Sequence, residues 1–157
     1  NVFYRVGMFE AFDEFFEEVF ARFEQPESWR LFPETVDVLK TLKGQGFELG
    51  IISNFDSRLF SVLRGLGIAD LFDTVTISSL AHAAKPSARI FHQALEKHAV
   101  DPDEALHVGD SERDDVKGAQ GVGLTGVLLA RGEGARPSGG TTIGNLNELL
   151  PLLSRLQ

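Results

Sequence analysis

The sequence predicts an α/β fold built on a doubly wound parallel sheet. Three observations indicate it: apolar strand patterns alternate with amphipathic helix patterns, polar residues follow the strands, and glycines end the helices. Strands are expected at residues 47–52, 73–78, 106–108 and 125–129, with a short closing strand and turn at 142–146. The carboxyl ends of parallel strands lie at one edge of a sheet, where ligands bind. We therefore expect the polar residues after these strands to form the functional site.

The helices between the strands show apolar residues at helical spacing. They are expected at residues 33–43, 57–66 and 148–156, with two more beginning near Pro86 and near Asp114. Pro86 suits the first turn of its helix, because the N–H that proline lacks would be unsatisfied there anyway. Glycines at positions 44, 46 and 67 end the first two helices, and the glycine-rich residues 131–140 are expected to form a mobile surface loop.

An acidic, phenylalanine-rich helix is expected over residues 8–23, where aromatic residues recur at helical spacing with acids between them. Seven of the 13 phenylalanines fall before Glu24, which is more aromatic surface than a free helix exposes to water. Packing in the core is the favoured explanation. A face that binds a partner is the second.

The composition is that of a soluble globular domain. With 157 residues, 43% hydrophobic and 24% charged, the chain can bury one sizeable core. The net charge of −8 argues against nucleic acid as a partner, because binding a phosphate backbone needs a basic face. Cysteine is absent, which excludes disulfides and thiolate chemistry. Since no apolar run reaches the roughly 20 residues of a membrane span, we expect no membrane partner and a cytoplasmic location.

The most informative motif follows the strand at residues 106–108. Gly109 breaks the strand, and four carboxylates and a hydroxyl follow within residues 110–115. Acids at the carboxyl edge of a parallel sheet are placed to hold a hard divalent cation such as Mg²⁺. Alternatively, Asp110 or Ser111 simply caps the helix that starts near Asp114.

Two other strand ends favour an anion site. Ser53 and Asn54 follow the strand at 47–52 and lead into a helix, where neutral donors suit a phosphate, although both residue types are also ordinary helix caps. Lys85 lies in the loop after the strand at 73–78. A loop lysine is usually just solvated, but its position near the other strand ends indicates an ammonium aimed at phosphate.

Four histidines complete the candidate residues. His82 precedes Lys85 in the same loop and is the only histidine expected near the site. His107 is expected to pack in the core or near the end of its strand. His92 and His98 are six residues apart, which does not place them on one helix face as a metal pair requires, so both are expected at the surface.

The ordered motifs hhhSN, KP and hhxGDSxxxD, taken together, resemble the haloacid dehalogenase-like superfamily, in its phosphatase-like subgroup, over residues 32–150. The resemblance implies a Rossmann-like core and Mg²⁺-dependent hydrolysis of a small phosphorylated metabolite. Ser53 and Asn54 would bind the phosphoryl group, and Lys85 would steady its charge. Asp110 would ligate Mg²⁺, while Asp115 would hold the metal's water shell or Lys85. Phosphoryl transfer needs these parts, because its catalysis is mainly positioning and charge neutralisation.

The aspartate nucleophile of this family is not found where the resemblance places it. In the family it belongs to an Asp-x-Asp motif on an N-terminal strand, which lies between the strands matching 47–52 and 106–108. The one Asp-x-Asp here begins at Asp101 in a loop, where Asp101 is expected to begin a turn. We expect residues 1–30 to be the end of a helical cap with its return linker, and 31–157 to be the core without its first strand.

This interpretation leaves unpaired strand edges, which cost unmade backbone hydrogen bonds. We therefore expect a preceding segment or a partner chain to supply the strand and to cover the phenylalanine-rich helix. The chain by itself is expected to be inactive.

Two other functions stay open. A non-catalytic phosphate-binding or regulatory protein would keep the pocket without the nucleophile and use the phenylalanine-rich helix as its interface. A haloacid dehalogenase would need no metal, so the acids at 110 and 115 favour the phosphatase.

Overall fold

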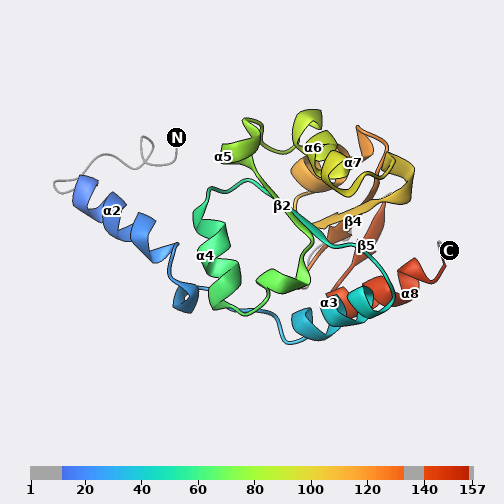
Figure 1. Cartoon of the computed structure of the whole chain (residues 1–157), viewed down its shortest axis with the longest axis horizontal. Coiled ribbons are helices and arrows are strands. Elements are labelled where there is room, and N and C mark those ends of the chain that lie inside the picture. Colours follow the sequence, from blue (N-terminus) through green and yellow to red (C-terminus); the bar gives the residue numbers. More distant parts are fainter. Residues whose placement is uncertain (1–11, 133–139, 156–157) are drawn as a thin grey trace.

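The computed structural model describes residues 12–132 and 140–155, and its strands form two parallel sheets (Figure 1). The strands are β1 (Gly50–Ser53), β2 (Thr74–Ile77), β3 (Leu106–Gly109), β4 (Thr125–Leu129) and β5 (Thr141–Ile143). β1 pairs with β2 in one sheet, and the other has the order β3-β4-β5. The α/β class and the parallel pairing are confirmed. Within the described residues, β1 and β3 each pair with a single strand and not with each other.

Helices connect the strands. The α-helices are α2 (Phe12–Arg22), α3 (Thr35–Gly44), α4 (Arg58–Gly65), α5 (Ser78–Ala81), α6 (Ala88–His98), α7 (Gly118–Gln120) and α8 (Leu149–Leu153). Short 3₁₀ turns are η1 (Pro26–Ser28), η2 (Ala69–Leu71), η3 (Pro102–Glu104) and η5 (Leu146–Glu148), and η4 (Glu112–Lys117) is a π-helical segment. Among these helices, none is both long and apolar enough to cross a membrane.

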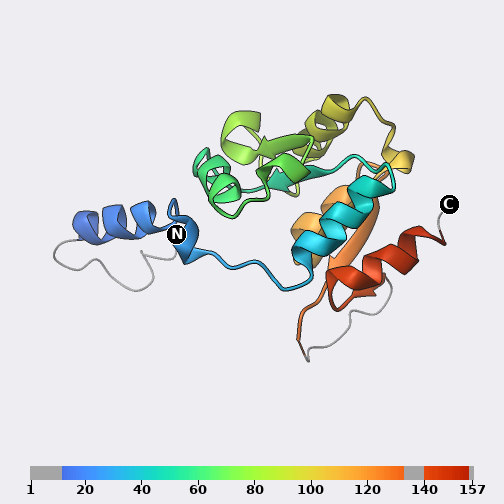
Figure 2. The same ribbon diagram turned by 60° about the horizontal axis from the view of Figure 1, so that its bottom comes forward.

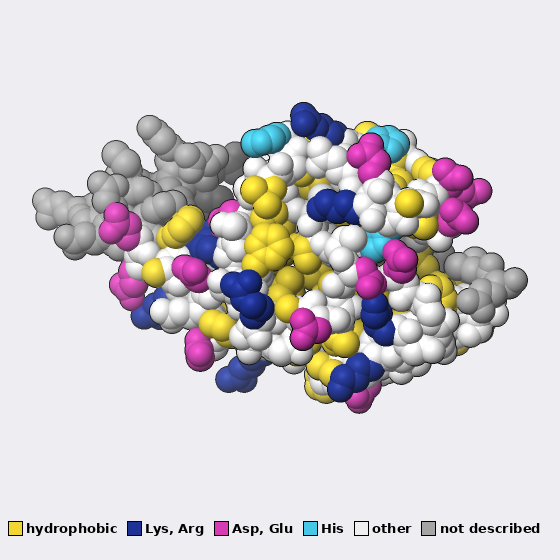
Figure 3. Space-filling view, viewed as in Figure 1, with side chains coloured by type: hydrophobic (Ala, Val, Ile, Leu, Met, Phe, Trp, Pro, Cys, Tyr) yellow, Lys and Arg dark blue, Asp and Glu magenta, His cyan; other side chains and the backbone are white. Residues whose placement is uncertain are grey.

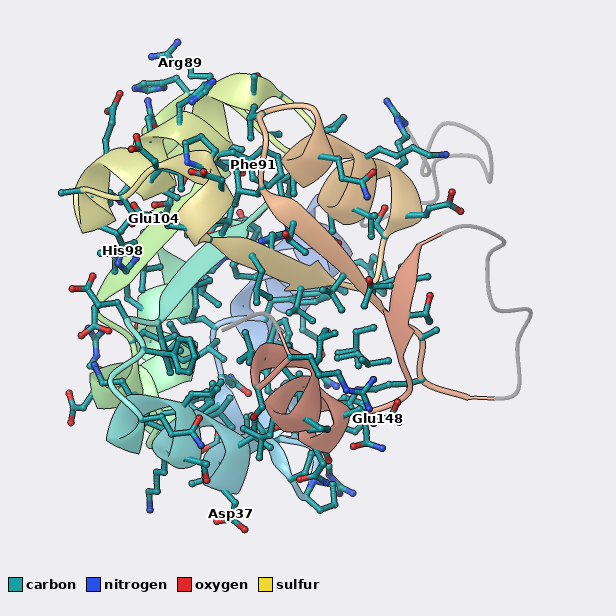
Figure 4. The ribbon with its side chains drawn as sticks, turned by 90° about the vertical axis from the view of Figure 1, so that its right-hand side faces the viewer. Asp37, Arg89, Phe91, His98, Glu104 and Glu148 are labelled. Atoms are coloured by element: carbon teal, nitrogen blue, oxygen red, sulfur yellow. The ribbon has the colours of Figure 1, made fainter. Side chains whose placement is uncertain are left out.

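Two apolar clusters pack on opposite sides of the strands. Helices α3 and α8 cover one side, and α5, α6 and α7 cover the other (Figure 1). The first cluster comprises Val38, Leu42, Val127, Ile143, Leu149 and Leu153. The second comprises Ala81, Ile90, Phe91, Leu95, Ala119 and Leu124. Phe91 points into the interior and is fully buried, whereas Asp37 and Arg89 lie at the periphery (Figure 4). This three-layer arrangement places the loops after β1 and β3 at one end of the strands.

Several predicted boundaries shift for local reasons. β1 begins at Gly50 rather than at residue 47, because the Asp73 carboxylate accepts the Leu49 N–H at 2.8 Å in place of a strand partner. α6 begins at Ala88, so Pro86 lies before the helix rather than in its first turn. A turn closed by the Ser87 N–H on the Ala84 carbonyl at 2.9 Å delays the helix.

The short helix α5 was not predicted, and its first residue, Ser78, was assigned to the end of the preceding strand. Its first two residues bond instead to the Phe55 carbonyl, through the Ser78 hydroxyl at 3.1 Å and the Ser79 N–H at 3.3 Å. The C-terminal helix is shorter than predicted, with η5 before it. Most of the expected glycine-rich loop, residues 133–139, lies outside the described residues.

Helix α2 lies to one side of the strands, next to α4, and an extended segment connects it to α3 (Figure 2). The part of the predicted helix before Phe12 lies outside the described residues. Phe15, Phe20 and Phe23 are 43%, 46% and 44% exposed, so packing in the core, the favoured explanation, is wrong for these rings. Directly after this helix, Phe23 packs on the rings of Trp29 and Phe55, which precedes α4, and not on the sheet. Hydrophobic side chains also show at the surface between α4 and α7 (Figure 3).

Candidate functional site

Asn54 joins the loop after β1 to the loop that carries Lys85. Its Nδ2 donates to the Lys85 carbonyl at 3.0 Å, and the Lys85 N–H donates to its Oδ1 at 2.7 Å. Ser53 is half-buried at the end of β1. The structure therefore brings the residues predicted for the anion site together across two loops.

Lys85 continues this network to Asp115. Its Nζ lies 2.6 Å from Asp115 Oδ1, and the two side chains are 14% and 4% exposed. His107 Nε2 lies 2.9 Å from the same oxygen, and Asp115 Oδ2 accepts the Ser111 N–H at 2.9 Å. Burial alone would raise the pKa of Asp115, but the hydrogen bonds from His107, Lys85 and the Ser111 N–H outweigh it and hold that pKa well below the usual aspartate range. Asp115 is therefore a buried anion with both oxygens engaged.

The local fold after β3 explains how Asp115 reaches this position. The π-helical turn η4 returns the chain, with the Asp115 N–H donating to the Ser111 carbonyl at 2.9 Å. A Cβ on Gly109 would lie only 2.1 Å from Asp115 Cγ, so glycine is required at the end of β3. Ser111 Oγ accepts the Asp114 N–H at 3.1 Å. Of Asp110 and Ser111, the two residues predicted as possible caps, Ser111 is therefore the one that caps the helix.

Asp110 is exposed directly after β3, and in the described part of the chain its carboxylate takes part in no hydrogen bond or ion pair. No group of three or more His, Cys, Asp or Glu side chains that could hold a metal occurs within residues 12–132 and 140–155. Mg²⁺ does not need such a cage, since it is usually held by one or two carboxylates, waters and substrate phosphate. The donors present therefore fit Mg²⁺ at Asp110, with Asp115 occupied by Lys85.

Two histidines differ from expectation. His107 packs edge to face on the buried Phe91 ring at 5.3 Å, as expected of a core residue, but it also contacts Asp115 in the site, which was not expected. His82, the histidine expected near the site, is exposed and has a left-handed backbone conformation, with φ of 49°. His98 is not a surface residue: its side chain is 12% exposed and bonds Glu48 Oε2 at 2.7 Å and Thr74 Oγ1 at 2.6 Å. His92 is exposed, as expected.

A sequence signal for His107 did exist. It lies two residues before Gly109 on the same strand, and alternate residues of a strand face the same side. His107 therefore faces the side on which Gly109 leaves room for Asp115.

The Asp101-x-Asp103 motif lies away from this network. Asp101 is the N-cap of η3, which precedes β3 and so lies at the opposite end of that strand from Asp110. The Asp101 N–H donates to Glu104 Oε2 at 3.0 Å, as part of a reciprocal capping arrangement. Asp101 begins a turn, as predicted.

Chemically, the network presents a half-buried ammonium, a strand-end hydroxyl and an exposed carboxylate at one end of the strands. The ammonium and hydroxyl suit an anion, and the carboxylate suits the cation that would accompany it.

Comparisons with known proteins match one family over most of the chain. Residues 7–123 match the family model of the haloacid dehalogenase-like hydrolases. The haloacid dehalogenase-like hydrolase domain-containing protein 3 of Bos taurus is 35% identical over 147 residues, which cover 90% of this chain and 59% of that protein. This chain thus spans well under two thirds of that relative.

Solved structures share the fold, and two of them are hydrolases of this kind. A HAD phosphatase from Thermococcus onnurineus superposes with a TM-score of 0.79 at 34% identity, over 88% of this chain and 64% of that one. The HAD-hydrolase YfnB from Bacillus subtilis, bound to magnesium, superposes with a TM-score of 0.73 at 27% identity, over 82% of this chain and 57% of that one.

Proposed function

The chain belongs to the haloacid dehalogenase-like hydrolase family, and on this premise we propose that it forms the phosphate-binding core of a Mg²⁺-dependent phosphatase for a small phosphorylated metabolite. The observation that carries the proposal is the network that joins Asn54, Lys85 and Asp115 at the ends of separate strands. The similarity to a phosphatase and to a magnesium-bound hydrolase supports it.

Each residue near the network has a distinct part. The Ser53 hydroxyl donates to a phosphoryl oxygen. Asn54 holds the Lys85 loop in place, and its amide keeps a second hydrogen for the phosphoryl group because an NH₂ group has two donors. Lys85 neutralises phosphoryl charge, and Asp115 keeps its ammonium in position at 2.6 Å. His107 and the Ser111 N–H hold Asp115 in turn.

Asp110 would hold Mg²⁺ together with waters and phosphate oxygens. Asp115 would act through Lys85 or through a metal-bound water, since both of its oxygens already accept hydrogen bonds from protein groups. When bound, the ion supplies charge neutralisation for the phosphoryl group.

We propose that the attacking aspartate comes from outside these 157 residues. The one Asp-x-Asp motif lies at the wrong end of β3. Within residues 12–132 and 140–155, β1 and β3 each keep one unpaired edge, which is consistent with a strand inserted between the two sheets. In this arrangement α2 and η1 form the end of a cap and its return linker.

Calorimetric titration with inorganic phosphate in the presence of Mg²⁺ tests the binding part of the proposal. We expect Lys85→Met to weaken binding by about tenfold or more, because it removes a charge-assisted contact worth roughly 1.5–3 kcal/mol. Lys40→Met is the matched control, since Lys40 is an exposed lysine on α3. Equal affinities for the two variants and the unmodified chain would contradict the proposal.

Hydrolysis of p-nitrophenyl phosphate tests the nucleophile. The 157-residue chain is expected to bind phosphate without hydrolysing this ester. Mg²⁺-dependent turnover that Asp110→Ala abolishes would show that a nucleophile exists within these residues.

A second candidate is a phosphate-binding protein without catalysis. It is favoured by the separation of Asp101 from the network, because the binding groups are then present without an attacking aspartate. To distinguish the two candidates, the chain is extended at its N-terminus by the family's first strand. If the extended protein binds phosphate but does not hydrolyse it, the second candidate is correct.

A further inference from the structure

The loop that follows β1 contacts two parts of the molecule at once. On one side, Asn54 makes both of its hydrogen bonds to the Lys85 backbone, at 3.0 and 2.7 Å. On the other side, Phe55 and Arg58 contact the segment that runs from α2 to Trp29. The same short stretch of chain therefore borders the proposed phosphoryl site and α2.

Phe55 is the centre of the second contact. Its ring lies 5.9 Å from the Trp29 ring at an interplanar angle of 88°, and 6.5 Å from the Phe23 ring. Trp29 and Phe23 also pack edge to face at 5.9 Å, and Trp29 Nε1 donates to the Phe23 carbonyl at 3.1 Å. Edge-to-face packing of this kind stabilises beyond the burial of area alone.

Arg58 ties the same loop to α2 through its guanidinium. Nε and Nη2 donate to the Asp56 carboxylate at 2.8 and 2.6 Å, while Nη1 donates to the Phe20 carbonyl on α2. The guanidinium carbon lies 3.4 Å from the centre of the Phe20 ring and 5.2 Å from that of Phe55. The Arg58 side chain is 14% exposed, so these contacts are largely shielded from water.

We propose that Arg58, together with Phe55, is a positioning residue that fixes α2 to the phosphate-binding loop, so that the loop and α2 respond together when an anion binds. The proposal rests on the proposed function, since it takes the anion to be a phosphoryl group at Ser53, Asn54 and Lys85. Arg58 suits this role because a planar fork can bond a carboxylate and a carbonyl while stacking on a ring, which lysine cannot do.

The molecule contains its own reporter, because Trp29 is its single tryptophan and packs on Phe55. The experiment titrates the chain with inorganic phosphate and Mg²⁺ and records Trp29 emission and calorimetric heat on the same samples. The variants are Arg58→Met, which keeps the apolar stem, and Arg58→Lys, which keeps the charge. Arg64→Met is the matched control, because Arg64 lies exposed on the same helix and, among the described residues, its side chain bonds only the Ser61 hydroxyl, at 3.3 Å.

We expect phosphate to change Trp29 emission in the unmodified chain and in Arg64→Met. In Arg58→Met and Arg58→Lys the emission change should be lost while the heat of binding persists. Two results would overturn the proposed coupling between the loop and α2. One is a heat of phosphate binding with no change of Trp29 emission in the unmodified chain, and the other is an unaltered emission change in Arg58→Met. Either result would leave the proposed function unaffected.

Hydrogen exchange decides the matter if phosphate gives no heat, an outcome that would count against the proposed function alone. Arg58→Met should then speed amide exchange in α2 by about tenfold, equivalent to about 1.4 kcal/mol. It should also speed exchange at the loop from Asn54 to Asp56 and at the Lys85 N–H, which bonds Asn54 Oδ1. Faster exchange in α2 alone would overturn the proposal, because the loop and α2 would then be independent.

Discussion

Replacing Asp115 with asparagine should remove a large part of the protein's stability. The substitution preserves shape but removes the charge that faces Lys85 and His107, and it places an NH₂ group among groups that donate hydrogen bonds. Asp115 is 3% exposed, so water cannot replace the lost interactions. Removing one partner of a buried ion pair costs about 3–5 kcal/mol, against a total stability of about 5–15 kcal/mol for ordinary domains.

Urea unfolding at neutral pH, with a chelator present, measures this cost through Trp29 emission and circular dichroism. Asp114→Asn is the matched control, because Asp114 is the next residue along, its side chain is 36% exposed, and its ion pair with Arg113 spans 3.8 Å. The control should cost about 1 kcal/mol or less. If Asp115→Asn proved no more costly than Asp114→Asn, the account of Asp115 as a buried, fully bonded anion would be refuted.

A double variant completes this test. Lys85→Met alone leaves Asp115 buried with His107 and the Ser111 N–H. Lys85 and Asp115 share one contact at 2.6 Å. The loss of unfolding free energy in the double variant, Lys85→Met with Asp115→Asn, should therefore be smaller than the sum of the losses in the two single variants. A strictly additive cost would mean that the ion pair contributes no coupling free energy.

Three further substitutions test other parts of the account. Gly109→Ala should destabilise the protein by about 3 kcal/mol or more, since its Cβ would lie 2.1 Å from Asp115 Cγ; an unchanged Tm in thermal unfolding would argue against this packing. The Lys43 ammonium and the Leu49 N–H lower the pKa of Asp73, so its stabilisation is present above the unfolded aspartate pKa of about 3.9 and is lost as pH falls through the folded value. The stability difference between the unmodified chain and Asp73→Asn should therefore narrow in acid, and a difference independent of pH would contradict the assignment. Phe91→Ala should cost about 3–5 kcal/mol in urea unfolding because the ring is fully buried; a loss below about 1 kcal/mol would show that the site collapses or is not core.

The sequence predicts that the polar residues after the strands lie close together, because parallel strands bring their carboxyl ends to one edge of a sheet. Asn54, Lys85 and Asp115 follow three different strands, and the structure joins them in one hydrogen-bonded network. The position of Asp115 after β3 could be predicted from the sequence. Which of its oxygens bonds Lys85, and which bonds the Ser111 N–H, depends on the π-helical turn η4. No periodicity in the sequence indicates that turn.

The unpredicted contacts of two histidines have a common physical cause, because both depend on distant parts of the chain. Strand alternation with Gly109 indicates the side that His107 faces, but it does not indicate that Asp115 returns to that side. His98 bonds Thr74 and also Glu48, which lies 50 residues away, and the contact of His107 with Asp115 depends on the chain returning after Ser111. The aromatic face of α2 was recognised from its spacing. The spacing did not reveal that its rings meet Phe55 and Arg58 rather than the sheet.

The central claim is that the loops after β1 and β3, together with Lys85, form an anion site. The most direct test is NMR, with the chemical shifts of backbone and side-chain amides followed as inorganic phosphate is added in the presence of Mg²⁺. The account predicts that the largest shifts occur at Ser53, the Asn54 side chain, Lys85 and Asp110, and that Lys85→Met suppresses them. Shifts spread evenly over the surface, or centred on η3 at the opposite end of β3, would contradict it.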